Sequence, residues 1–169
     1  MKYFQIIIFS IIIFSCIENK KESQSFNINY DKIDHYHLNT ETSKIYNGLA
    51  HKEKEILNEI LYSASPSSIN DLTAINIIES QSEKKTIDSK FNSEIVKSVS
   101  LHEINQNEEQ PITSCEPIYR DILIFRKENK ITSIIKICFD CSENQVLGIN
   151  FDSSKYFFGV NYKKLKKLL

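Results

Sequence analysis

The stretch that decides the fold is YRDILIFRKENKITSIIKICF, which runs from Tyr119 to Phe139. Two runs rich in branched and aromatic residues, 119–126 and 131–139, flank a short polar segment. Two such runs around a tight polar turn are typical of a β-hairpin. We therefore expect this hairpin to form the centre of a small antiparallel or mixed sheet.

The hairpin turn is expected to centre on Glu128 and Asn129. That register places Asp121 opposite Lys136, where the two would form a cross-strand ion pair. It also places apolar pairs on both faces of the hairpin, namely Ile122 with Ile135 and Leu123 with Ile134. Strands that are apolar on both faces are usually interior strands covered on each side.

The segments before the hairpin combine strand and helix patterns. Lys32–Leu38 is expected to form a strand, and Ala50–Tyr62 carries one apolar stripe at helical spacing. The apolar segment Leu72–Ile78 is too short for its period to distinguish a strand from a helix. Asp88 or Ser89 could cap a helix carrying Phe91, Ile95 and Val99, but residues 95–101 also alternate as a strand does. Residues 105–110 are polar and are expected to form a loop.

The segments after the hairpin complete an α+β fold with a few helices. Val146–Phe151 is expected to be a strand, and Tyr156–Gly159 a hydrophobic turn. Asn161 is expected to cap a final helix, Tyr162–Leu169, with its leucines inward and its lysines outward. The lysines of this helix are Lys163, Lys164, Lys166 and Lys167. We expect them to face solvent, which is favoured over contact with anionic lipid headgroups.

Length and charge exclude several classes of protein. The chain has 169 residues, 21 Lys+Arg against 22 Asp+Glu and a formal net charge of -1. This length suits one domain, and the charge balance does not favour a nucleic-acid binder. With Gly 3, the chain offers no phosphate-cradling loop, and it contains no G-x-S-x-G or H-E-x-x-H motif. We therefore expect no catalytic residues, no metal and no cofactor, and the sequence does not favour an enzyme.

The N-terminus has the organisation of an export signal. Lys2 precedes an apolar run from Phe4 to Phe14, which is too short to span a bilayer core of about 30 Å. The run ends in Ile13-Phe14-Ser15-Cys16, which resembles the lipobox of bacterial lipoprotein precursors. The resemblance implies that residues 1–15 are removed and that the sulfur of Cys16 carries a diacylglyceryl group.

The segment after the lipobox predicts a tether and a location. Residues 16–26 are polar after the lipidated cysteine, so they are expected to link the lipid flexibly to a single domain at 27–169. The membrane partner is then reached through the lipid on Cys16. The predicted location is the cell envelope, with the outer membrane favoured if the cell has two membranes, because Ile17 is not the aspartate of an inner-membrane retention signal.

The remaining cysteines are Cys115, Cys138 and Cys141, in a protein expected to reach a compartment where disulfides persist. Cys115 and Cys141 fall near each other at the open end of the hairpin, and we predict that they are the closest pair, with Cα atoms within about 7 Å. Cys138 lies on the strand and is expected to be a small buried thiol. In thioredoxin-like proteins a redox C-x-x-C opens a helix, and the sequence after Cys141 has no helical period, so an oxidoreductase is not favoured.

Two histidines lie on the first predicted strand. His35 and His37 are two residues apart and therefore point to one face, for which a solvated surface is favoured over a metal site. The segment 115–141 also resembles a pattern in small uncharacterised bacterial lipoproteins, and that resemblance implies no activity. The sequence thus predicts a membrane-anchored binding or interaction module of unknown ligand. The alternative is a thiol–disulfide or metal-binding protein that uses Cys115, Cys138 and Cys141.

Overall fold

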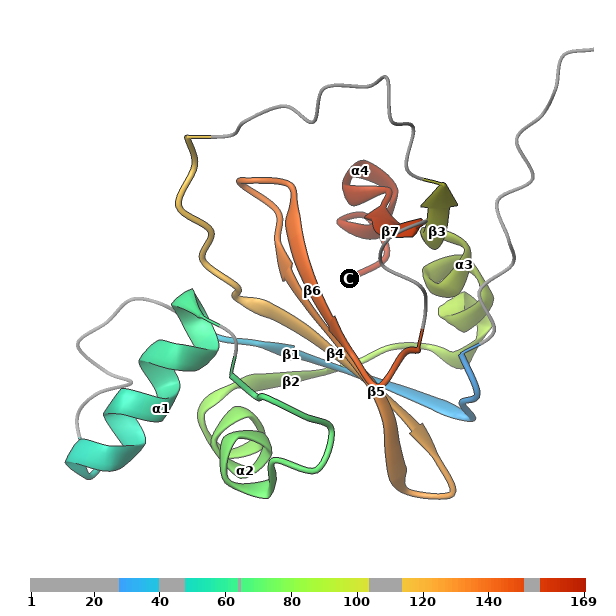
Figure 1. Ribbon diagram of the computed structural model, residues 1–169. Helices are drawn as coiled ribbons and strands as arrows, with labels where there is room; N and C mark the ends of the chain where they lie inside the picture. Colours follow the sequence, from blue (N-terminus) through green and yellow to red (C-terminus); the bar gives the residue numbers. More distant parts are fainter. Residues whose placement is uncertain (1–27, 40–47, 64, 104–113, 151–155) are drawn as a thin grey trace, which may run out of the picture.

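The computed structural model describes residues 28–39, 48–63, 65–103, 114–150 and 156–169. The signal peptide, Cys16, the tether and the loop expected at 105–110 lie outside these residues. The described part has a mixed α+β fold with a five-stranded antiparallel sheet in the order β2-β1-β4-β5-β6 and a two-stranded antiparallel sheet of β3 and β7 (Figure 1). The predicted fold class is therefore confirmed. The strands are β1 Lys32–His37, β2 Glu83–Thr86, β3 Val99–Glu103, β4 Asp121–Lys127, β5 Lys130–Cys138, β6 Glu143–Leu147 and β7 Tyr156–Val160.

The helices lie on both faces of the large sheet (Figure 1). One face is covered by α1 and α2, and the other by α3, α4 and the small sheet. The helices are α1 His51–Tyr62, α2 Leu72–Gln81, α3 Asn92–Lys97 and α4 Tyr162–Leu165, and a 3-10 turn, Ser89–Phe91, precedes α3. Among the described residues, none of the helices has the length and apolar character needed to cross a membrane.

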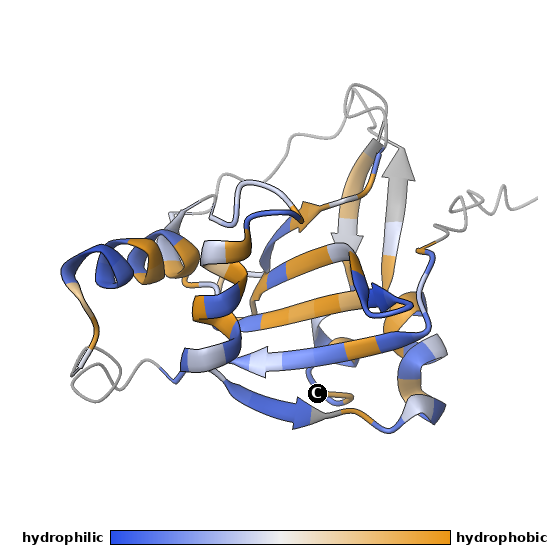
Figure 2. Ribbon diagram, turned by 90° about the horizontal axis from the view of Figure 1, so that it is seen from below, coloured by the Kyte–Doolittle hydropathy of each residue, from blue (hydrophilic) through white to orange (hydrophobic). Residues whose placement is uncertain are grey.

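Alternation along β4 divides the core into two halves. Ile122 and Ile124 point to the face covered by α1 and α2, whereas Leu123 and Phe125 point to the face covered by α3 and α4. All four are fully buried, so β4 is covered on each side, as the hairpin pattern predicts. The interior strands are mostly hydrophobic, whereas the edge strand β2 is hydrophilic (Figure 2). β2 carries two lysines, Lys84 and Lys85, and charged side chains on an edge strand disfavour its pairing with other chains.

The predicted hairpin forms, but beyond the turn the observed register differs from the predicted one by one residue. Lys127 pairs with Lys130 as expected, and then Thr132 is inserted as a β-bulge in β5. The Thr132 hydroxyl donates to the carbonyl of Phe125 at 3.2 Å. Asp121 consequently lies opposite Ile137, and Lys136 lies opposite Ile122, not Asp121. The predicted Asp121–Lys136 ion pair is therefore wrong, because these side chains point to opposite faces of the sheet.

Two predictions near the C-terminus are also wrong. Residues 156–160 form strand β7 and not a hydrophobic turn, because β3 supplies a partner that is distant in sequence. The strand predicted at Val146–Phe151 instead spans Glu143–Leu147, since Gly148 follows with a positive φ of 78°. A Cβ at Gly148 would lie 2.3 Å from the carbonyl oxygen of Thr132, so only glycine fits where the chain leaves the sheet.

Capping side chains explain the structure of the two segments whose pattern fitted both helix and strand, 72–78 and 91–101. Asp71 caps α2 by accepting from the backbone N–H of Ala74 at 3.2 Å, so Leu72–Ile78 is helical. Asp88 accepts from the N–H of Lys90 at 3.0 Å, and the chain then changes from helix to strand at Ser98. Both alternatives for 91–101 are thus partly realised. The α1 helix agrees with the predicted Ala50–Tyr62 to within one residue.

Candidate functional site

A pocket of about 670 Å³ lies where the small sheet meets one end of the large sheet. Its walls come from the end of α3, from β3 and β7, from the start of α4 and from the turn between β5 and β6. The lining residues are Lys97, Ser98, Ser100, Cys141, Ser142, Glu143, Asn144, Phe157, Phe158, Gly159, Val160, Asn161 and Tyr162. This volume lies within the range of about 300–1,000 Å³ typical of small-molecule sites.

Hydrogen bonds at two chain junctions hold one wall of the pocket. The N–H of Asn161 donates to the carbonyl of Ser98 at 2.7 Å, which ties the end of β7 to the start of β3. The Ser98 hydroxyl donates to the carbonyl of Ile95 at 2.7 Å. The side chain of Asn161 accepts from the N–H of Lys164 at 3.0 Å and so begins α4 as predicted, although this helix ends at Leu165.

In the opposite wall, Asn144 links strand β6 to β7 and to the start of α4. Its side-chain amide donates to the carbonyl of Phe158 at 3.3 Å and to the hydroxyl of Tyr162 at 2.7 Å. Burial raises the pKa of Tyr162, so this hydroxyl keeps its proton at neutral pH. Its ring packs edge to face on Phe139, with ring centroids 6.4 Å apart. The pocket is therefore built on fixed side chains of a sheet edge and a helix start.

The aromatic and charged groups of the pocket suit a ligand with an apolar face and polar edges. Because side chains alternate along β7, Phe158 is buried in the core while the neighbouring Phe157 is 42% exposed. Lys97 and Glu143 contribute one charge of each sign to the lining. Hydroxyl and amide groups of serines and asparagines supply most of the other polar groups. This balance favours a neutral or dipolar molecule over a strongly charged one.

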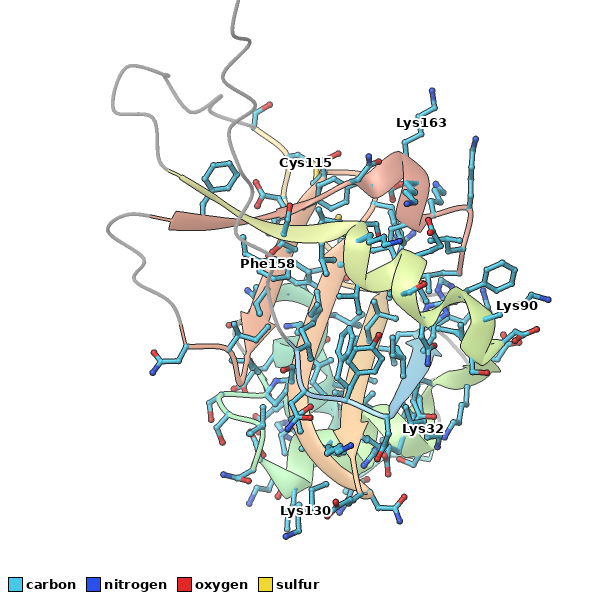
Figure 3. The ribbon with its side chains drawn as sticks, turned by 90° about the vertical axis from the view of Figure 1, so that its right-hand side faces the viewer. Lys32, Lys90, Cys115, Lys130, Phe158 and Lys163 are labelled. Atoms are coloured by element: carbon cyan, nitrogen blue, oxygen red, sulfur yellow. A yellow bond between two sulfur atoms is a disulfide. The ribbon has the colours of Figure 1, made fainter. Side chains whose placement is uncertain are left out.

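The cysteines lie beside the same pocket. Cys115 and Cys141 form a disulfide with a Cα–Cα distance of 5.6 Å, as predicted, and Cys138 is a free, buried thiol. Cys115 lies at the end of the molecule that carries Lys163, far from the β4–β5 turn with Lys130 (Figure 3). The disulfide anchors the segment before β4 to the β5–β6 turn, which forms part of the pocket wall.

The histidines do not form the predicted solvated face. His35 is fully buried, and its Nε2 lies 2.8 Å from Oδ1 of Asp121. Nδ1 of His37 lies 2.9 Å from the same oxygen. Burial alone would raise the pKa of Asp121, but the bonds to His35 and His37 outweigh it and hold the pKa below its ordinary value of 3.8. The prediction of a solvated face is wrong because β1 pairs with β4, and in that register Asp121 lies opposite His37 on the same face as both histidines.

A buried lysine lies on the other face of the sheet. Nζ of Lys136 donates to the carbonyls of Ser63 and Ser65 at 2.6 and 2.8 Å and to Oε1 of Gln145 at 3.0 Å. It also lies 4.6 Å from the centroid of the Tyr119 ring. Burial lowers the pKa of Lys136 to about 7. Lys136 thus connects the end of α1 to the sheet and is not accessible to a ligand.

The structure brings together some of the sequence-predicted residues and adds others. The cysteines cluster, but among the described residues no group of three or more His, Cys, Asp or Glu side chains could hold a metal ion. Of the C-terminal lysines, Lys164 pairs with Glu94 at 2.5 Å and Lys166 lies over the Phe139 ring, while Lys163 and Lys167 are exposed. Sequence reasoning missed the pocket and the Asp121 cluster, since both depend on pairing between distant strands.

Comparison with known proteins found no matching family model, no similar curated protein and no similar solved structure.

Proposed function

We propose that this protein is a membrane-anchored lipoprotein whose α+β domain binds a small molecule in the pocket between the two sheets. The pocket is the observation that carries the binding part of this proposal. It combines a volume suitable for a small molecule with an exposed aromatic ring, Phe157, and several polar groups. A neutral or dipolar molecule with one apolar face is the class of ligand that this lining favours.

The anchoring part of the proposal rests on the sequence of the N-terminus. The apolar run ending in Ile13-Phe14-Ser15-Cys16 supports lipid attachment at Cys16 in the cell envelope, with the outer membrane favoured in a cell with two membranes. Two or three acyl chains hold a protein stably at a bilayer, because each buried methylene contributes about 0.8 kcal/mol. The polar residues that follow would let the domain reach a ligand away from the bilayer surface.

Fatty-acid labelling and membrane fractionation test the anchor. The Cys16→Ala variant should remain an unlipidated precursor, lose the label and leave the membrane fraction under conditions where the wild type is retained. A matched control is Cys138→Ala, which removes a different cysteine and should label and fractionate as the wild type does. If Cys16→Ala is labelled and retained like the wild type, the lipobox interpretation is wrong.

A further inference from the structure

Three cysteine residues meet at one end of the hairpin. Cys141 is bonded to Cys115, and the free Cys138 packs in the same buried cluster as Cys141 and Tyr119. We propose that these cysteines form a thiol–disulfide exchange site, in which Cys138 displaces Cys115 from Cys141 and so exposes a reactive thiol. The substrate class is a disulfide carried by a second molecule.

The turn between β5 and β6 holds Cys138 and Cys141 together. Cys138 is the last residue of β5, and Ser142 closes the turn with a positive φ of 54°. The backbone N–H of Cys141 donates to Sγ of Cys138 at 3.4 Å. This hydrogen bond holds the Cys138 sulfur against the backbone of Cys141. The sharp bend that a C-x-x-C exchange needs is therefore present without a helix after Cys141.

The attacking cysteine of this exchange is buried and the leaving cysteine is exposed. Cys138 is 2% exposed and Cys141 is 9% exposed, whereas Cys115 is exposed. The buried Cys138 is shielded from an external disulfide and packs in one cluster with Cys141. A released Cys115 thiolate, in contrast, would be stabilised by water and accessible to another molecule. Cys141 also lines the pocket, so exchange would occur next to the proposed binding site.

The exchange conserves electrons and needs no added oxidant. Sγ of Cys138, as a thiolate, attacks Sγ of Cys141, and the Cys138–Cys141 bond forms while the Cys115–Cys141 bond breaks. The electron pair of the broken bond leaves with the sulfur of Cys115, and water carries the proton lost by Cys138. The Cys115 thiolate then attacks a disulfide of the substrate, which forms a mixed disulfide and releases the other half of that substrate as a thiol.

Oxidised glutathione is a suitable probe of this exchange on the purified, lipidated full chain. The protein is isolated without reductant, incubated at about pH 8, where thiolates are populated, and mapped by mass spectrometry of non-reduced peptides. We expect glutathione on Cys115 and a new Cys138–Cys141 disulfide in the same molecule. Glutathione on Cys138 with the Cys115–Cys141 bond intact would overturn the proposal, and so would the absence of any adduct on Cys115.

Two variants test the exchange without relying on the equilibrium between the two disulfides in the wild type. Cys115→Ala leaves Cys138 and Cys141 as thiols, which should form one internal disulfide under the same treatment. If they remain free or each takes up glutathione, the two sulfurs are not placed for exchange and the proposal fails. Cys138→Ala should keep the Cys115–Cys141 disulfide and take up no glutathione at Cys115, and its thermal unfolding checks that the fold is retained. The exchange does not depend on a ligand in the pocket, so it can fail while pocket binding holds.

Discussion

The side-chain amide of Asn144 donates a 2.7 Å hydrogen bond to the hydroxyl of Tyr162. Asn144 lies on the edge strand of the large sheet and Tyr162 begins α4, so this bond joins two elements that are adjacent only in the folded protein. A second bond from the same amide reaches the carbonyl of Phe158 on β7. One side chain thus holds the two sheets together at the wall of the pocket.

Removing this side chain should loosen the pocket wall. We expect Asn144→Ala to lower the free energy of unfolding by about 1–2 kcal/mol, since two partly buried acceptors lose their donor. Denaturant unfolding measures the change. Asn150→Ala, at an exposed asparagine beyond the same strand, is the control and should change stability by less than about 0.5 kcal/mol. Equal effects of the two substitutions would show that Asn144 does not connect the sheets.

Lys136 should make stability rise with pH above neutrality. Burial lowers its pKa from 10.5 to about 7, so between these values the unfolded chain binds more protons at this position than the folded protein. The stability of the wild type relative to Lys136→Met should therefore increase by up to about 1.4 kcal/mol per pH unit from about pH 7 to 10.

Denaturant unfolding at several pH values checks this dependence. Lys130→Met, at an exposed turn position, serves as the control and should show no such trend relative to the wild type. The assignment fails if the difference between the wild type and Lys136→Met stays constant across this range.

Asp121 should contribute stability that is lost in acid. Because its folded pKa is held below the ordinary 3.8, its contribution is complete above pH 3.8 and disappears as the pH falls through the folded value. We expect Asp121→Asn to cost about 1.5–3 kcal/mol at pH 6, the range for a hydrogen bond to a charged group, and much less near pH 2.

The control for this prediction is Asp140→Asn. Its carboxylate is 74% exposed and faces only Arg120, at 3.7 Å, among the ion pairs of the described residues. Acid titration of stability should be the same for this variant and the wild type. A stability loss in Asp121→Asn that is as large near pH 2 as at pH 6 would contradict the role assigned to the carboxylate.

Leu165 tests whether α4 packs against the sheet or against a membrane surface. It is fully buried in the cluster formed with Ile95, Val99 and Phe158, so Leu165→Ala should destabilise the fold by about 2–5 kcal/mol. Leu72→Ala removes the same atoms at a position that is 67% exposed and should cost less than about 0.5 kcal/mol. Unchanged unfolding of Leu165→Ala together with weaker liposome binding would instead favour a membrane-facing helix.

Local patterns in the sequence predicted most of the elements, because hydrophobic periodicity, caps and turns act over a few residues. Such signals predicted the hairpin, the α1 helix, the cap at Asn161 and the Cys115–Cys141 disulfide. The disulfide forms despite the register error, since both cysteines lie outside the paired part of the hairpin.

Features that depend on distant pairing could not be predicted in this way. The bulge at Thr132 has no glycine to mark it, yet it decides that Lys136 faces α1 and not Asp121. The contact of Asp121 with the histidines depends on the pairing of β4 with β1, which is distant in sequence. The segment 156–160 becomes a strand only because β3 lies beside it. The pocket combines these features, since its walls come from α3, both sheets and α4.

The binding account predicts a specific role for the exposed ring of Phe157. Neutral and dipolar aromatic fragments that bind the wild type should bind Phe157→Ala about tenfold more weakly, the loss expected from about 1.4 kcal/mol of aromatic contact. Tyr62 is a matched control, since its ring is 46% exposed at the end of α1, which packs on the opposite face of the large sheet. Fragments should bind Tyr62→Ala as they bind the wild type.

The most direct test of the proposed binding site is to map such a bound fragment by ¹H–¹⁵N chemical-shift changes on the wild-type protein. The account predicts that the largest shifts fall on backbone amides of residues that line the pocket, at Ser98, Ser142, Asn144 and Asn161. At the same fragment concentration these shifts should be much smaller in Phe157→Ala and unchanged in Tyr62→Ala. Shifts that concentrate on α1 and α2, or pocket shifts that are unchanged in Phe157→Ala, would contradict it.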